Sequence, residues 1–258
     1  MAEADPSTSA DFSMLQLDKR PCVKLSRSHL ADRKIVGFNN ADSRSRAFNL
    51  MRTRLLKSLP GPSPRLVGIT SATPAAGKSF ISVNLALSLA KVAEGPVILV
   101  DLDLRRGSVA TELGLAPEPG VGDYLAGEAT LQELGVRIEG LPLAVLPTNV
   151  GPQDSAELLA GERYHRLVDA LRAQPANTVV IFDLPPVFAN DDAMLSIERL
   201  DAYVLVVDST ETSKSHVVDA ASTLAPATCI GTILNRYKGR MFERYGYGSK
   251  AYGAYYET

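Results

Sequence analysis

A lysine and a serine close a run of small residues whose spacing could bind phosphate groups. The segment Ala72–Ser79 reads ATPAAGKS and matches the pattern GxxxxGK[ST], with alanine at the first glycine position. An apolar run, LVGITS, precedes it, and a helical pattern, SFISVNLALSLAKV, follows it. Backbone N–H groups in such a loop, together with the N-terminus of the next helix, attract anions. The spacing therefore predicts a site for Mg-ATP.

Within this site, Lys78 is expected to reach the β- and γ-phosphates and the Ser79 hydroxyl to ligate Mg²⁺. An ordinary strand–turn–helix with an incidental lysine is the alternative. The predicted nucleotide contacts along the loop are Thr73, Pro74, Ala75, Ala76, Gly77, Lys78, Ser79 and Phe80.

Aspartates follow two other apolar runs. VILV leads into Asp101 and Asp103, and VVIF leads into Asp183. Ligands of open α/β sheets bind outside the carboxyl ends of the strands, so these acids should converge on the loop. One acid is expected to serve Mg²⁺ in a nucleotide site of this kind, and three exceed what binding alone requires. The predicted metal-binding residues are Ser79, Asp101, Asp103 and Asp183.

The additional carboxylates could act as a base. A phenol with a pKa of about 10 is mostly protonated at neutral pH, so a phosphoryl acceptor of this kind benefits from a nearby proton acceptor. Asp101 or Asp103 could fill that role while the other acid, with Asp183, holds the metal. All three could equally serve the metal. The predicted catalytic residues are Lys78, Asp101 and Asp103.

The C-terminal segment 236–258 is rich in tyrosine. Six of the nine tyrosines follow Asn235, separated by glycine and serine that favour a flexible chain. Fully extended, this tail spans roughly 75 Å at about 3.3 Å per residue. It could offer several phenols in turn to an active site, or it could be a low-complexity tail used for adhesion. The predicted phosphate acceptors are Tyr245, Tyr247, Tyr252, Tyr255 and Tyr256.

The elements that must position these residues follow from hydrophobic periodicity. Short, continuously apolar runs alternate with helical patterns, which predicts a doubly wound, mostly parallel α/β sheet flanked by helices. The predicted strands are Leu66–Ser71, Val97–Asp101, Leu143–Leu146, Val179–Asp183, Tyr203–Val207 and Cys229–Leu234. The predicted helices are Ser43–Leu59, Lys78–Val92, Ser155–Ala173, Ala193–Arg199 and Ser213–Leu224.

The chain divides into three predicted parts: a flexible basic arm over 1–37, a nucleotide-binding domain over 38–235, and the tail over 236–258. From Met1 to Lys57 the chain carries eleven Lys and Arg against six Asp and Glu. This excess is either a solvated arm or a docking surface for an acidic partner or a membrane face.

Composition excludes several classes of function. The formal net charge of −2 argues against general nucleic-acid binding. The two cysteines and three histidines lack metal-ligand spacing. The small number of cysteines fits a reducing compartment. We find no secretory signal and no apolar run long enough to span a membrane, so we expect a cytoplasmic protein.

The motifs SATPAAGKS, VILVDLDLRR and VVIFDLPP resemble the Walker A, A′ and B motifs of the bacterial tyrosine autokinases (BY-kinases) of capsule and exopolysaccharide loci. Their order and spacing, together with the terminal tyrosine cluster, extend the resemblance from about Val36 to the C-terminus. It implies a P-loop NTPase fold and an ATP- and Mg²⁺-dependent kinase that phosphorylates its own C-terminal tyrosines between subunits of a ring. It also implies that Arg105 completes the A′ motif and that Asn235 contacts the adenine.

The resemblance further implies partners. The cytoplasmic tail of a membrane chain-length regulator would activate the kinase, a tyrosine phosphatase would reverse it, and the chain would lie at the inner membrane through its activator. One departure concerns the ring: the family's ExxRxxR pattern becomes Arg46, Asn49 and Arg52 here, so the acidic member is absent.

Two other functions remain open at this point. A positioning ATPase of the ParA/MinD type shares the fold but carries a lysine where this chain has Thr73. An interaction switch would use nucleotide only to tune partner binding.

Overall fold

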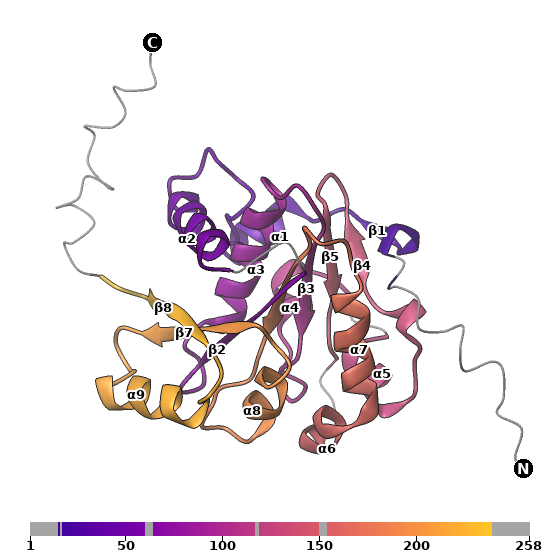
Figure 1. Ribbon diagram of the computed structural model, residues 1–258. Helices are drawn as coiled ribbons and strands as arrows, with labels where there is room; N and C mark the ends of the chain where they lie inside the picture. Colours follow the sequence, from indigo (N-terminus) through magenta and orange to yellow (C-terminus); the bar gives the residue numbers. More distant parts are fainter. Residues whose placement is uncertain (1–14, 16, 60–63, 117–118, 150–153, 239–258) are drawn as a thin grey trace, which may run out of the picture.

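The computed structural model describes residues 15, 17–59, 64–116, 119–149 and 154–238. Its centre is an eight-stranded sheet in the order β1-β4-β5-β3-β6-β2-β7-β8 (Figure 1). Neighbouring strands are parallel except β4 and β5, which are antiparallel. The strands are β1 (Cys22–Val23), β2 (Arg65–Ser71), β3 (Val97–Asp101), β4 (Val136–Ile138), β5 (Leu143–Leu146), β6 (Val179–Asp183), β7 (Ala202–Asp208) and β8 (Cys229–Asn235). The expected mostly parallel α/β sheet is confirmed.

Helices cover both faces of this sheet (Figure 1). The α-helices are α1 (Arg27–Asp32), α2 (Ser45–Ser58), α3 (Lys78–Ala90), α4 (Val109–Leu113), α5 (Val121–Ala126), α6 (Ser155–Ala160), α7 (Glu162–Arg172), α8 (Asp192–Ile197) and α9 (Lys214–Thr223). Two 3₁₀ turns are η2 (Leu17–Lys19) and η3 (Leu131–Glu133). The pattern at 155–173 predicted one helix, and the structure has two, α6 and α7, with the extended Gly161 between them.

Strand β3 shows why the strands are continuously apolar. Val97 and Leu99 face the layer formed with α1, α2, α3 and α4. Ile98 and Val100 face the opposite layer, formed with α5, α6, α7 and α9. Because both faces of a central parallel strand are covered, no position along it can be polar until the strand ends. The first polar residue of β3 is Asp101, at its carboxyl end.

Residues 17–37 of the predicted flexible arm form regular structure, whereas residues 1–14 and 16 lie outside the described residues. Residues 17–37 contribute the edge strand β1, which pairs with β4, and the helix α1. Leu30, Ile35 and Val36 are buried in the same layer as α2 and α3. The backbone N–H groups of Val36 and Gly37 both donate to Oδ1 of Asn84, at 2.8 and 2.9 Å. The apolar residues of this basic segment follow no helical or strand period, which is why the sequence predicted no helix or strand there.

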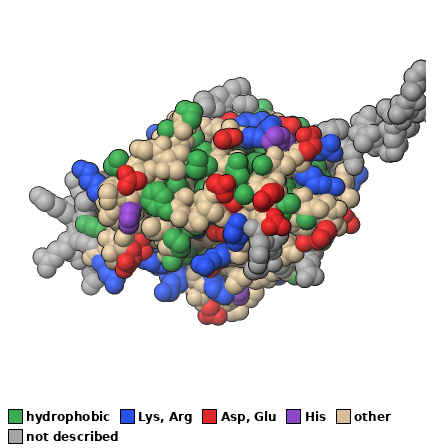
Figure 2. Space-filling model, turned by 90° about the horizontal axis from the view of Figure 1, so that it is seen from below, with side chains coloured by type: hydrophobic (Ala, Val, Ile, Leu, Met, Phe, Trp, Pro, Cys, Tyr) green, Lys and Arg blue, Asp and Glu red, His purple; other side chains and the backbone are tan. Residues whose placement is uncertain are grey.

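The described surface gives no sign of one dominant charge on the face shown in Figure 2. Acidic and basic side chains alternate there with apolar ones. No helix in the described ranges combines the length and apolar character that crossing a bilayer requires.

Candidate active site

The predicted phosphate loop joins β2 to α3. Gly77 is the N-cap of α3 and has φ = 89°, and Ala75 also has a positive φ of 61°. Left-handed residues turn successive N–H groups toward one side of a loop, which is how an anion-binding concavity forms. Lys78 begins α3 and is only 7% exposed. The loop therefore has the backbone form that a phosphate site requires.

Strand register brings two of the predicted acids together. Asp101 of β3 and Asp183 of β6 are direct partners at the ends of neighbouring parallel strands, and both are fully buried. Asp103 lies two residues beyond β3, and its Oδ2 is 3.6 Å from Nζ of Lys78. The convergence expected from the sequence is thus present for Lys78 and all three acids.

Each oxygen of Asp101 accepts a backbone hydrogen bond. Oδ1 accepts from the N–H of Asp103 at 3.2 Å, and Oδ2 accepts from the N–H of Val109 at 3.1 Å. Gly107 makes this packing possible, because a Cβ there would lie 2.1 Å from Cγ2 of Thr148 and 3.0 Å from Oδ2 of Asp101. Asp101 is therefore fixed in orientation.

The buried carboxylates disfavour each other's charge. Burial, followed by the negative charge of Asp183, raises the pKa of Asp101 well above its usual range. Burial also raises the pKa of Asp183 to about 6, although the Lys78 ammonium and the hydroxyls of Ser79 and Ser82 act in the opposite direction. A bound cation would remove this repulsion, because it favours the ionised form of both acids.

The residues present fit Mg²⁺ held largely through water and phosphate. Oδ1 of Asp183 accepts from Ser82 at 2.9 Å, while Oδ2 is buried and has no hydrogen-bond partner among the described residues. In the part of the chain that the structure describes, no three His, Cys, Asp or Glu side chains surround one metal position. Mg²⁺ commonly uses one or two carboxylates with phosphate and water oxygens, so this arrangement suits it.

Arg105 is exposed and contacts two buried polar residues outside the loop. Its Nε donates to Oγ of Ser155 at 2.7 Å and is 3.5 Å from Oδ2 of Asp192. Ser155 in turn donates to the same Asp192 oxygen at 2.6 Å, and Asp192 is fully buried. The sequence did not single out Ser155 or Asp192, because each stands at a helix start where such residues are common caps.

Asn235, the predicted adenine contact, also reaches the loop. Its Nδ2 donates to the carbonyl of Ala76 at 2.8 Å, and its Oδ1 accepts from the N–H of Arg236 at 2.9 Å. The end of β8 is thereby tied to the phosphate loop. A Cβ at Gly77 would lie 2.3 Å from Nδ2 of Asn235, so this approach requires glycine.

The remaining predicted site residues are nucleotide contacts along the loop and phosphate acceptors in the tail. The ring of Phe80 packs edge-on against Phe48 of α2, with centroids 5.9 Å apart. Thr73, Pro74 and Ala75 lie at the partly or fully exposed tip of the loop. The predicted acceptors lie outside the described residues: Tyr245, Tyr247, Tyr252, Tyr255 and Tyr256.

Comparison with known proteins decides the family. The tyrosine-protein kinase YwqD of Bacillus subtilis is 30% identical over 230 residues, which cover 87% of this chain and 95% of that protein. The chain belongs to the bacterial tyrosine-protein kinase family. Another bacterial tyrosine-protein kinase, CpsD of Streptococcus agalactiae, is 27% identical over 82% of this chain and 90% of its own length. No family model matches the sequence.

Relatives in this kinase family differ in length. A Ralstonia nicotianae protein named EpsB is 33% identical over 208 residues, but this chain spans only 27% of its length. The kinase domain of Escherichia coli ETK superposes with a TM-score of 0.71 at 25% identity and covers 88% of this chain and 94% of that domain. The chimeric protein CapA2B2 has a TM-score of 0.72 at 28% identity, and the match covers 86% of this chain and 96% of CapA2B2.

The septum site-determining protein MinD from Pyrococcus horikoshii, in complex with Mg-ADP, shares the fold of this chain. The TM-score is 0.54 at 23% identity, and the match covers 68% of this chain and 71% of the MinD chain. This likeness confirms the expected P-loop NTPase fold class.

Proposed function

We propose that this chain is an ATP-dependent protein-tyrosine kinase that phosphorylates the tyrosines of its own C-terminal tail. The observation that carries the proposal is the convergence of Lys78, Asp101, Asp103 and Asp183 beside a phosphate loop, in a chain that ends in a tyrosine cluster. Family membership supports the same reaction. Bound Mg-ATP would supply the phosphoryl group and the positive charge that screens it.

The residues of the chain then have separable roles. Lys78 and the loop N–H groups bind and orient the phosphates, and the Ser79 hydroxyl and Asp183 hold Mg²⁺. Asp101 is fully buried and held by two N–H groups, so it orients the metal shell rather than meeting a phenol. Asp103 is 7% exposed and lies at the mouth of the site, so we assign it the proton of the acceptor tyrosine.

The wider setting follows from the family resemblance. We propose that phosphoryl transfer occurs between subunits and that the cytoplasmic segment of a membrane regulator activates the kinase. A tyrosine phosphatase would reverse the phosphorylation, and the kinase would control capsule or exopolysaccharide synthesis. Arg46 occupies the position of the absent acidic residue, so the subunit contacts of this chain either differ from the family pattern or are weaker.

Mass spectrometry of the purified full chain after incubation with Mg-ATP tests the reaction. We expect phosphotyrosine between Tyr245 and Tyr256 that is lost in Lys78→Met and retained in Lys91→Met, which changes the same residue type at the end of the same helix. The incubation is repeated with the cytoplasmic segment of a candidate activator.

ATP hydrolysis with an unmodified tail would instead indicate a positioning ATPase. ATP binding with neither hydrolysis nor tail modification, even with the activator segment present, would indicate an interaction switch. The Asp103→Asn variant tests the assigned base: it should retain nucleotide binding while the transfer rate falls by about 10²-fold or more.

A further inference from the structure

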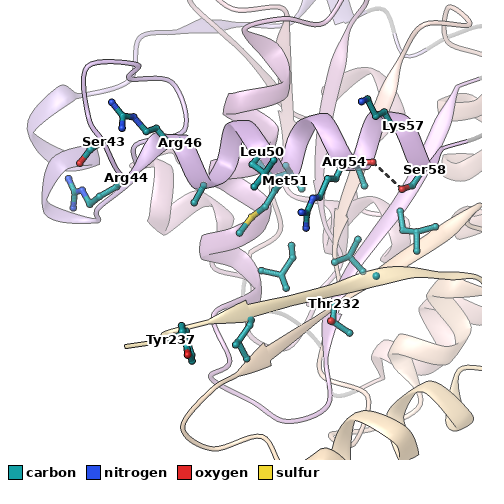
Figure 3. A pocket seen from close by; sticks show the side chains of 18 residues that line it. Ser43, Arg44, Arg46, Leu50, Met51, Arg54, Lys57, Ser58, Thr232 and Tyr237 are labelled. Atoms are coloured by element: carbon teal, nitrogen blue, oxygen red, sulfur yellow. Dashed lines mark hydrogen bonds between the residues drawn. The ribbon is translucent and has the colours of Figure 1, made fainter. Parts of the chain in front are cut away.

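An apolar groove of about 1000 Å³ lies between α2 and β8, and no residue of the phosphate loop lines it (Figure 3). Its floor includes Leu50, Met51 and Leu55 of α2 with Ile230 and Ile233 of β8. Leu50 is 40% exposed, so the floor is open to solvent. Apart from the subunit contacts discussed for Arg46, none of the roles proposed above uses this groove.

The charges around the groove are all of one sign. Its lining includes Arg44, Arg46, Arg54 and Lys57, and it contains no Asp or Glu. Arg44 pairs with Asp42, but the other three form no ion pair in the described part of the chain. Arg54 extends from α2 toward β8 across the groove (Figure 3). An occupant should therefore combine apolar surface with negative charge.

Strand β8 also suits an extended occupant. Among the described residues it is the last strand of the sheet and pairs only with β7, so no described strand pairs with the backbone groups on its outer edge. Five consecutive residues, 230–234, line the groove, which therefore follows the strand. A peptide can hydrogen-bond to such an edge while its side chains enter the groove.

The chain's own tail begins at this groove. Tyr237 lines one end of it (Figure 3), and the tail segment 239–258 follows after one residue. Helix α2 is roughly 21 Å long at about 1.5 Å per residue. The tail is roughly 65 Å long when extended, at about 3.3 Å per residue, so it could turn back and run the length of the groove.

Phosphorylation would change the sign of the tail's charge. Segment 239–258 has three basic side chains and two glutamates, so unmodified it does not complement the basic rim. Each phosphotyrosine adds about −1.5 to −2 charges at pH 7. Arginine binds phosphate through charge-assisted hydrogen bonds, and the tyrosine ring can pack on the apolar floor.

We propose that the groove between α2 and β8 binds the phosphotyrosine-bearing tail of the same chain. This inference rests on the proposed tail phosphorylation and adds a destination for its product. Docking holds the phosphorylated tail away from the acidic active site, and removal of the phosphates releases it.

Binding of synthetic peptides tests the groove independently of catalysis. The host is the full-length Lys78→Met chain, whose tail is unmodified, and the probes are fluorescent peptides of residues 239–258, unmodified or phosphorylated at Tyr245 and Tyr247. Fluorescence anisotropy should show the phosphopeptide binding at least about tenfold more tightly, a difference of about 1.4 kcal/mol. Inorganic phosphate at equal concentration should not displace it.

Charge reversal locates the site. In the same host, Arg46→Glu with Arg54→Glu should weaken phosphopeptide binding at least about tenfold. The matched control is Lys24→Glu with Arg27→Glu, two exposed cations near the opposite sheet edge, which should change it less than about twofold. Equal binding of both peptides, no binding, or equal effects of the two double variants would overturn the proposal.

Incorporating phosphotyrosine at Tyr247 in the Lys78→Met chain tests docking within one chain. We expect this chain to lose binding of the labelled phosphopeptide without any gain in sedimentation coefficient. A gain in sedimentation coefficient would assign the groove to the tail of a second copy. Because the phosphate is installed chemically, docking could succeed here even if the chain failed to phosphorylate itself.

Discussion

Asp101 and Asp183 lie directly opposite each other at the carboxyl ends of β3 and β6, and neither side chain reaches solvent. Two buried carboxylates in this position repel each other and are costly to ionise. The fold nevertheless holds them there with backbone hydrogen bonds to Asp101 and a hydroxyl bond to Asp183. Such a pair is stable when a cation lies beside it, as in a nucleotide site.

This pair makes the stability of the metal-free protein depend on pH. Since the pKa of Asp183 is raised to about 6, the folded state holds a proton that the unfolded state has already lost between pH ~4 and ~6. Stability should therefore fall as the pH rises through that window, by an amount on the order of 3 kcal/mol at about 1.4 kcal/mol per pKa unit.

Urea unfolding in EDTA at pH 4 and pH 7.5 measures this effect. The Asp183→Asn variant removes one of the two carboxyl groups whose pKa is raised, so its free energy of unfolding should vary less between the two pH values. A variant with the same pH dependence as the parent would show that Asp183 does not titrate in this range.

Ser82 should tune metal binding without touching the nucleotide loop's phosphate contacts. It donates to Oδ1 of Asp183 at 2.9 Å, and loss of such a bond typically costs about 10–100-fold in metal affinity. We expect Ser82→Ala to raise the Mg²⁺ concentration needed for half-maximal nucleotide binding. Ser88→Ala, on the same helix α3 but bonded to Asn49 of α2, is the control and should leave that concentration unchanged.

Asn235 should stabilise the phosphate loop through its bond to the Ala76 carbonyl. Asn235→Ala removes a net contribution of about 1 kcal/mol, so nucleotide affinity measured by calorimetry should fall roughly fivefold. Asn177→Ala breaks a comparable amide-to-carbonyl bond, to Glu94, far from the loop and should leave affinity intact. An unchanged affinity in Asn235→Ala would mean that the loop holds its form without β8.

The N-terminal residues up to 37 should contribute to global stability. Asn84 accepts the backbone N–H groups of Val36 and Gly37, and all three residues are buried. Asn84→Ala leaves two buried donors unpaired and should lower the free energy of unfolding by about 2–4 kcal/mol. Asn40→Ala, at an exposed position nearby, should change it by less than about 0.5 kcal/mol. If Asn84→Ala lowered the free energy of unfolding no more than Asn40→Ala, residues 17–37 would not unfold cooperatively with the rest of the domain.

The central part of the fold was predictable because its signals are local. Runs such as VILV and VVIF are apolar at every position, which indicates burial on both faces, and each ends at the acid that the site uses. The phosphate loop was predictable for the same reason: its spacing reflects a backbone shape set within a few residues. The short strands β1 and β4 were missed, since two or three residues carry too little periodicity.

The sequence by itself determined the phosphate loop, the acids at the strand ends, the buried parallel sheet and the tyrosine cluster, because each depends on neighbouring residues. Only the tertiary structure decided how these parts meet. It brought Asp101 to Asp183, tied Asn235 to the loop, placed Arg105 against Asp192, and formed a basic groove between α2 and β8. These relationships depend on strand order and register, which join residues that lie roughly 80 to 190 positions apart, and no local pattern encodes such contacts.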